Sequence, residues 1–166
     1  MPPLPEYATE KTSGDPRAGA LITIALDEPI SNLDGYTLYL PVSHAERDGP
    51  LPILVYLQGA YRVGGRINDL NHWGLCRLVR DDNDLSLKRH QLMLDKFIVA
   101  SLHIQDGSFD DQAEAVDGIL DGIDANYGRD PDKIYVTGMS RGGHGSWSLA
   151  SKIPEHLGAI APVGGY

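Results

Sequence analysis

A serine flanked by glycines has the clearest chemical potential in this sequence. Ser140 is the centre of residues 138–142, GMSRG, which match the pattern G-x-S-x-G. In that pattern the serine occupies a sharp turn between a strand and a helix, where its hydroxyl can attack an acyl carbonyl. Side chains two positions before or after the serine would collide with neighbouring backbone, so glycine is needed at both places. Ser140 is therefore the candidate nucleophile.

A second glycine-containing segment follows an apolar run earlier in the chain. Residues 51–57, LPILVYL, lead directly into residues 58–60, QGA. Attack on a carbonyl creates an oxyanion, which two backbone N–H groups can stabilise. The predicted donors are the amides of Ala60 and of Arg141, the residue that follows the nucleophile. Three further side chains near the same predicted sheet edge are candidates for lining a substrate pocket: Gln58, Tyr61 and His103.

Residues 59–66 partly match the pattern of a phosphate-binding loop. Gly59 and Gly64 have the G-x-x-x-x-G spacing of such loops. Gly65 and Arg66 stand where a phosphate-binding lysine and a magnesium-binding hydroxyl would be required. The sequence therefore gives no support for nucleotide binding, and we expect neither a metal nor an organic cofactor.

A serine nucleophile also needs a base, and the histidines near Ser140 in the sequence are weak candidates. His144 follows four residues later on the predicted helix, where its side chain is expected to point away from the hydroxyl. His156 follows Pro154 and is expected at the surface. Asp106 could serve as an acid, but a loop or cap residue is the simpler interpretation.

The elements that must position these residues alternate along the chain. Apolar runs predict strands over residues 20–26, 36–40, 51–57, 97–103, 134–137 and 159–163. Apolar residues at three- and four-residue spacing predict a helix over 110–127, with a capping box at its start (Ser108 and Asp111) and Gly128 at its end. A second helix is expected over 85–95, and residues 69–84 are expected to form a helix followed by a loop. This order predicts an α/β fold with a doubly wound, mostly parallel sheet and helices on both faces. Residues 1–19 are expected to be a flexible N-terminal segment and residues 20–166 a single, partial domain.

Together these segments resemble the α/β-hydrolase superfamily, in its esterase and polyhydroxybutyrate-depolymerase-like branch. The matching stretches come in that family's order: 36–41 (YTLYLP), 51–60, 130–143 (DPDKIYVTGMSRGG), 153–154 and 159–165. One departure is Gln58, where the family usually has histidine. The resemblance implies that an acidic residue and a histidine follow the serine on later strands. Because little sequence follows residue 163, we expect a C-terminally truncated fragment, or one part of a split enzyme, that is almost inactive alone.

Composition narrows the classes of partner. The chain has 166 residues, 42% of them hydrophobic, and a formal charge of −9. Such an acidic chain is not expected to bind nucleic acid or an anionic membrane. The single cysteine, Cys76, excludes a disulfide within the chain and any cysteine-based metal cluster. The sequence shows neither a secretory signal nor a membrane-spanning run, and a cytoplasmic location is expected.

The sequence thus predicts a serine hydrolase that acts on carboxylic esters, either small or linked to a polymer. Peptidase and acyltransferase activities remain open, because the serine motif does not distinguish them. The alternative is a non-catalytic, hydrolase-like binding module in which the glycine-rich turn only packs a helix on the sheet. In either case the open edge of the strand over 159–163 predicts marginal stability or self-association.

Overall fold

The computed structural model describes residues 19–41, 44, 49–60, 65–81, 92 and 95–165. The expected flexible segment before Gly19, Tyr61, and most of the helix expected over 85–95 lie outside these residues. The described elements follow one another as β1 (Ala20–Ile30), β2 (Leu33–Leu40), β3 (Leu51–Leu57), the 3-10 helix η3 (Ile67–His72), α1 (Gly74–Asp81), β4 (Ile98–Ile104), α3 (Ala113–Tyr127), β5 (Arg129–Met139), α4 (Arg141–Lys152), the 3-10 helix η4 (Pro154–His156) and β6 (Ala159–Val163).

The strands form one sheet in the order β1-β2-β4-β3-β5-β6. The pairs β3–β4, β3–β5 and β5–β6 are parallel, whereas β1–β2 and β2–β4 are antiparallel. Leu57 lies level with Leu102 of β4 on one side and with Gly138 of β5 on the other. The central strands therefore end together, and the segments that follow them meet at one edge of the sheet. The predicted α/β class is confirmed, with antiparallel strands added on the β1 side.

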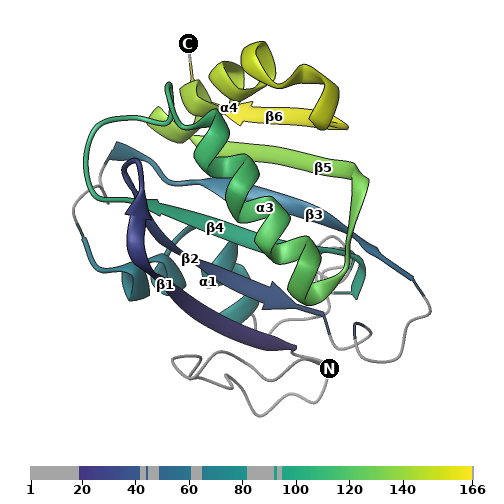
Figure 1. Cartoon of the computed structure of the whole chain (residues 1–166). Coiled ribbons are helices and arrows are strands. Elements are labelled where there is room, and N and C mark those ends of the chain that lie inside the picture. The colour runs from purple at the N-terminus through teal and green to yellow at the C-terminus, as the bar shows by residue number, and fades with distance from the viewer. Residues whose placement is uncertain are drawn as a thin grey trace.

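Helices cover both faces of this sheet, as Figure 1 shows with α3 in front of the strands and α1 behind them. On the α3 and α4 side, one large core joins Val116, Ile123 and Leu149 to the apolar side chains of the strands. On the α1 side, a smaller cluster joins Cys76 and Val79 to Tyr39 and Val99. Within the described chain, no helix is long and apolar enough to cross a membrane.

Local chemistry decides where α3 begins and ends. Gly128 adopts a left-handed conformation (φ 66°, ψ 59°), and its N–H donates to the carbonyl of Asp124, so the predicted C-terminal stop is confirmed. The predicted start was wrong by three residues. The Ser108 hydroxyl donates to the carboxylate of Asp110 over 2.7 Å, and the helix begins only at Ala113, after Gln112. The hydroxyl therefore closes a short turn before the helix, instead of capping the helix itself.

Candidate active site

Ser140 occupies a strained turn at the carboxyl end of β5. It stands between Met139, the last residue of β5, and Arg141, the first of α4, with φ 56° and ψ −115°. A non-glycine residue with positive φ is uncommon, and such strain persists only where the surrounding structure enforces it. Here the Ser140 amide donates to the carbonyl of Val163 in β6 over 2.8 Å. The side chain is exposed, so its hydroxyl is available to a ligand.

The flanking glycines are required by close backbone contacts. A Cβ atom at Gly138 would lie 2.5 Å from the carbonyl of Gly142. A Cβ atom at Gly142 would overlap the carbonyl oxygen of Leu57, at the end of β3. Neither clash involves a side chain that could move aside. The spacing that singled out Ser140 thus reflects how tightly the turn is packed between β3 and the start of α4.

The segment after β3 lies beside Ser140. A Cβ atom at Gly59 would lie 3.1 Å from the Met139 carbonyl oxygen and 3.9 Å from the Ser140 Cβ. Gln58 is buried, and its Nε2 donates to the carbonyl of Ile104, at the end of β4, over 3.1 Å. Ala60 follows and is exposed. The loop expected to supply one backbone donor therefore runs next to the serine.

The first turn of α4 faces the same region. Helix N-termini carry N–H groups without intrahelical partners and a partial positive charge, which together favour a developing negative charge. Arg141 provides the first of these amides. Its side chain is turned elsewhere and donates from Nη1 to the carbonyl of Gly107, in the segment after β4. The part of Arg141 available at this turn is therefore its backbone.

The two histidines that follow Ser140 are both engaged with carboxylates. The His144 Nδ1 lies 2.9 Å from a carboxylate oxygen of Asp110, and the His156 Nδ1 lies 3.0 Å from one of Asp117. Both imidazoles are about half exposed. The Asp110 contact links α4 to the segment that precedes α3. The geometry gives His144 a role in joining two elements.

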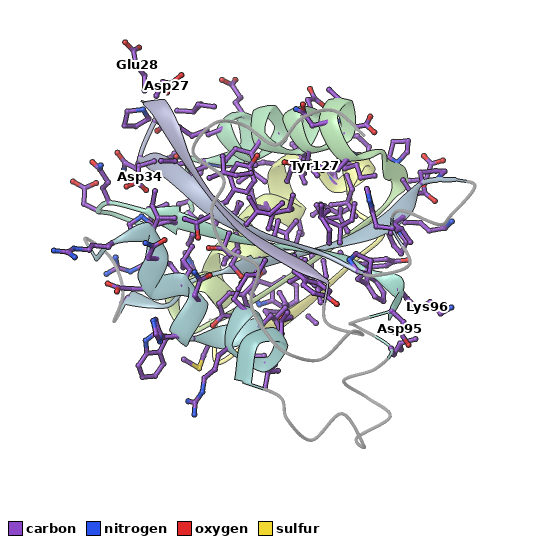
Figure 2. The ribbon with its side chains drawn as sticks, turned by 90° about the horizontal axis from the view of Figure 1, so that it is seen from below. Asp27, Glu28, Asp34, Asp95, Lys96 and Tyr127 are labelled. Atoms are coloured by element: carbon purple, nitrogen blue, oxygen red, sulfur yellow. The ribbon has the colours of Figure 1, made fainter. Side chains whose placement is uncertain are left out.

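His103 also pairs with a carboxylate, in an arrangement that the sequence did not reveal. It is 1% exposed, and its Nδ1 lies 2.5 Å from Oδ1 of Asp34. Figure 2 shows Asp34 near Asp27 and Glu28, far from Asp95 and Lys96, which precede β4. The pair thus lies at the carboxyl end of β4, two strands away from the strand that carries Ser140. His103 is at the expected edge of the sheet but is buried, and it is not among the residues that line the cavity on the α1 face.

An open cavity of about 580 Å³ lies on the α1 face of the sheet. It borders the turn through Gly138 and Met139, and through Val163, which accepts the Ser140 amide. Its other walls come mainly from apolar and aromatic side chains of β3 and α1 and from the residue before α1: Tyr56, Trp73, Leu75 and Leu78. Gln58 is buried and does not contribute to these walls, and Tyr61 lies outside the described residues. Ser140 itself does not line the cavity, which offers a mainly apolar surface beside the two residues that precede the serine.

Known proteins resemble this chain in structure. No family model matches the sequence, and no curated protein matches it. Among solved structures, a thermostable esterase superposes with a TM-score of 0.65 at 21% identity over 86% of this chain and 40% of its own. The feruloyl esterase module from Clostridium thermocellum gives a TM-score of 0.67 at 14% identity, over 90% of this chain and 55% of its own. An S-formylglutathione hydrolase from Agrobacterium tumefaciens gives 0.62 at 14% identity, over 92% and 60%.

The chain has the α/β-hydrolase fold. It spans between 40% and 60% of the length of these three proteins. The sheet, the turn at Ser140 and α4 are the elements of that fold on which the candidate site is built.

The thiol of Cys76 is not available for chemistry. Cys76 in α1 is fully buried, and burial raises the pKa of its thiol to about 12. Its Sγ lies 2.9 Å from the hydroxyl of Ser101 in β4. A thiol of that pKa carries almost no thiolate at neutral pH and is a poor nucleophile. Across the described residues, no cluster of three or more histidine, cysteine or carboxylate side chains could hold a metal.

Proposed function

We propose that this chain carries the nucleophile and oxyanion site of a serine hydrolase acting on carboxylic esters. The observation that carries the proposal is Ser140 itself, which is exposed, held at positive φ and enclosed by glycines whose positions leave no room for a side chain. Ordinary packing of a helix on a sheet does not require a strained, exposed serine. The esterases and the hydrolase among the similar structures agree with this chemistry.

The reaction divides into two transfers of an acyl group. The Ser140 hydroxyl oxygen attacks the ester carbonyl while a base takes its proton, and the carbonyl oxygen becomes an oxyanion. The amides of Ala60 and Arg141 donate hydrogen bonds to that oxyanion. Collapse of the intermediate breaks the bond to the alcohol, which leaves with a proton. Water then attacks the acyl group on Ser140, releasing the acid and restoring the hydroxyl.

The base and its supporting acid are proposed to come from residues other than those described. His103 is buried at the end of β4, two strands away from β5, and His144 lies on α4 with its Nδ1 against Asp110. Loss of the histidine from a serine triad lowers turnover by about 10⁶-fold, and binding together with oxyanion stabilisation leaves about 10³- to 10⁴-fold over water. The 166 residues alone should therefore turn over esters very slowly. A second chain or a further segment would restore the rate.

The substrate class proposed here is a carboxylic ester with an apolar group, either free or attached to a polymer. The cavity that reaches Gly138 and Met139, just before Ser140, has mainly apolar and aromatic walls, including Tyr56, Trp73 and Leu78. Apolar walls discriminate weakly between groups that differ by a methylene, so a range of esters should be accepted.

A fluorophosphonate probe followed by peptide mass spectrometry tests the proposal. We expect phosphonylation at Ser140 in the longest natural chain that contains these residues, much slower phosphonylation in the 166 residues alone, where no base is proposed, and none in Ser140→Ala. Ser31→Ala is the matched control, because Ser31 is the other described non-glycine residue with positive φ (57°) and lies outside the site. An unlabelled Ser140 in every form of the protein would favour a non-catalytic binding module instead.

A further inference from the structure

The side chain of Gln58, the residue after β3, forms a hydrogen bond to β4 beyond the point where the two strands stop pairing. Pairing between β3 and β4 ends where Leu57 meets Leu102. Ile104 lies past that point and is fully buried, so its carbonyl needs a donor that strand β3 no longer supplies. The carboxamide of Gln58, itself 2% exposed, donates to this carbonyl over 3.1 Å. One buried side chain thus ties the segment after β3 to the end of β4.

The backbone of the same residue is pressed against the turn that holds Ser140. The Gln58 carbonyl oxygen lies 2.9 Å from where a Cβ atom of Gly142 would be. The next residue, Gly59, faces Met139 and Ser140 at the distances given above. The backbone of Gln58 therefore lies close against α4, and its side chain is bonded to β4. Two residues later along the same segment comes the amide of Ala60.

We propose that Gln58 is a positioning residue, which fixes the Ala60 amide beside Ser140 by bonding to the carbonyl of Ile104. This inference rests on the proposed ester hydrolysis and adds a residue to it. Oxyanion donors must be held within about 0.5 Å of their working positions. A displacement of about 1 Å can lower a rate about 100-fold. Without the carboxamide donor, the segment after β3 loses this side-chain bond to β4 and can move away from the serine.

The experiment compares two substitutions of Gln58 with a matched control. Gln58→Met keeps the length of the side chain and removes the donor, whereas Gln58→His keeps an N–H that can donate. Arg129→Met is the control, because the Arg129 Nε also donates to a buried carbonyl, that of Leu120 over 2.9 Å, at the opposite end of β5. Two quantities are measured in each variant, made in the longest natural chain that contains these residues. They are the second-order rate constant for phosphonylation of Ser140 and the hydrogen exchange of the amides in residues 57–60.

We expect Gln58→Met to lower the rate constant by about 10- to 100-fold and to speed exchange at residues 57–60. Gln58→His should return the rate to within a few-fold of the wild type. Arg129→Met should lower the melting temperature. It should leave the rate constant for phosphonylation of Ser140 and the amide exchange of residues 57–60 unchanged. Rescue by histidine would separate positioning from a general loss of packing.

Three results would overturn the inference. The first is wild-type phosphonylation in Gln58→Met, and the second is an equal loss of rate in Arg129→Met, which would indicate general destabilisation. The third is unchanged exchange at residues 57–60 in Gln58→Met, which would show that the bond does not anchor this segment. The exchange measurement needs no reactivity, so it distinguishes a failure of anchoring from a failure of the proposed hydrolase chemistry, which would appear as an unreactive Ser140 in the wild type.

Discussion

Helices α3 and α4 pack on the same face of the sheet but use glycine in opposite ways. A Cβ atom added at Gly118 or Gly122 of α3 would have no described heavy atom within 4 Å. In α4, a Cβ atom at Gly143 would lie 2.7 Å from the Val163 carbonyl oxygen, and one at Gly142 would overlap Leu57. Glycine in α3 therefore only weakens a helix, whereas glycine in α4 allows the helix to approach other backbone.

The contrast extends to what holds each helix in place. α3 buries a stripe of large side chains at helical spacing: Val116, Ile119, Leu120 and Ile123. The only large apolar side chain that α4 buries is Leu149, and its other buried residues are glycines and Ser146. A helix held by side chains tolerates small shifts, because rotamers can adjust. A helix docked through backbone contacts has a fixed position, which suits the helix that begins at Ser140.

The largest expected effect is that of Gly142→Ala. The added methyl group would collide with the carbonyl of Leu57 and force α4 away from β3. Overpacking usually costs 1–3 kcal/mol where side chains can yield, so a clash between backbones should cost about 3 kcal/mol or more. Urea unfolding should show this loss, and phosphonylation of Ser140 should fall with it. A variant within about 0.5 kcal/mol of the wild type would contradict the contrast between the two helices.

Ile123→Ala should remove stability without altering the site. Ile123 is fully buried in the main core, and truncating such a side chain costs about 2–5 kcal/mol. Under conditions in which the variant remains folded, Ser140 should react with the probe at the wild-type rate, because α3 does not form the turn. Calorimetry measures the loss of stability, and labelling kinetics measure the reactivity of Ser140. A slowing of more than a few-fold would mean that α3 also positions the serine.

Gly122→Ala should stabilise the protein. The new methyl group would meet no described atom within 4 Å, and alanine favours the interior of a helix over glycine by about 0.5–1 kcal/mol. Replacing glycine by alanine should thus raise the free energy of unfolding in α3 and lower it in α4. A rise in the urea midpoint with an unchanged slope would establish the effect, and a fall would show that α3 is packed more tightly than its surroundings indicate.

The smallest effect concerns the ion pair that joins α3 to η4. A hydrogen bond to Asp117 and the charge of that carboxylate raise the pKa of His156 above its ordinary value of 6.5. The pair therefore contributes its full stabilisation below pH 6.5 and loses it as the pH rises through the raised pKa of the folded protein. Asp117→Asn should return the pKa of His156 toward 6.5 in an NMR titration. Because both groups are partly exposed, the accompanying change in stability should be slight. An unchanged titration would mean that the contact does not persist in solution.

Much of the fold could be predicted from local patterns. The strands over 51–57 and 159–163 have the predicted bounds, because each is an apolar run bordered by glycine or proline. Two other features depended on contacts that no local pattern encodes. β1 extends to Ile30, where it pairs with Leu33 across the following turn, and α3 starts late because Ser108 bonds to Asp110.

The candidate site also has features that the sequence predicts and features that depend on the assembled sheet. The position of Ser140 between a strand and a helix was predictable, since the glycine spacing describes the turn itself. The contact between Asp34 and His103 was not predictable, because it depends on the antiparallel register of β2 against β4. The bond from Gln58 to Ile104 likewise depends on where two neighbouring strands end. Pairings between distant strands are a property of the assembled sheet.

The partners that hold Ser140 also determine when its conformation can first exist. Leu57 is synthesised long before Gly142, and Val163 after both, so the turn can close only when β3, α4 and β6 have all docked. Contacts between distant segments form late, since the entropy of closing long loops opposes them. Before these contacts form, we expect this serine to have an ordinary, relaxed backbone. Its special geometry requires that these three elements have docked, so the conformation of the serine depends on contacts between distant parts of the chain.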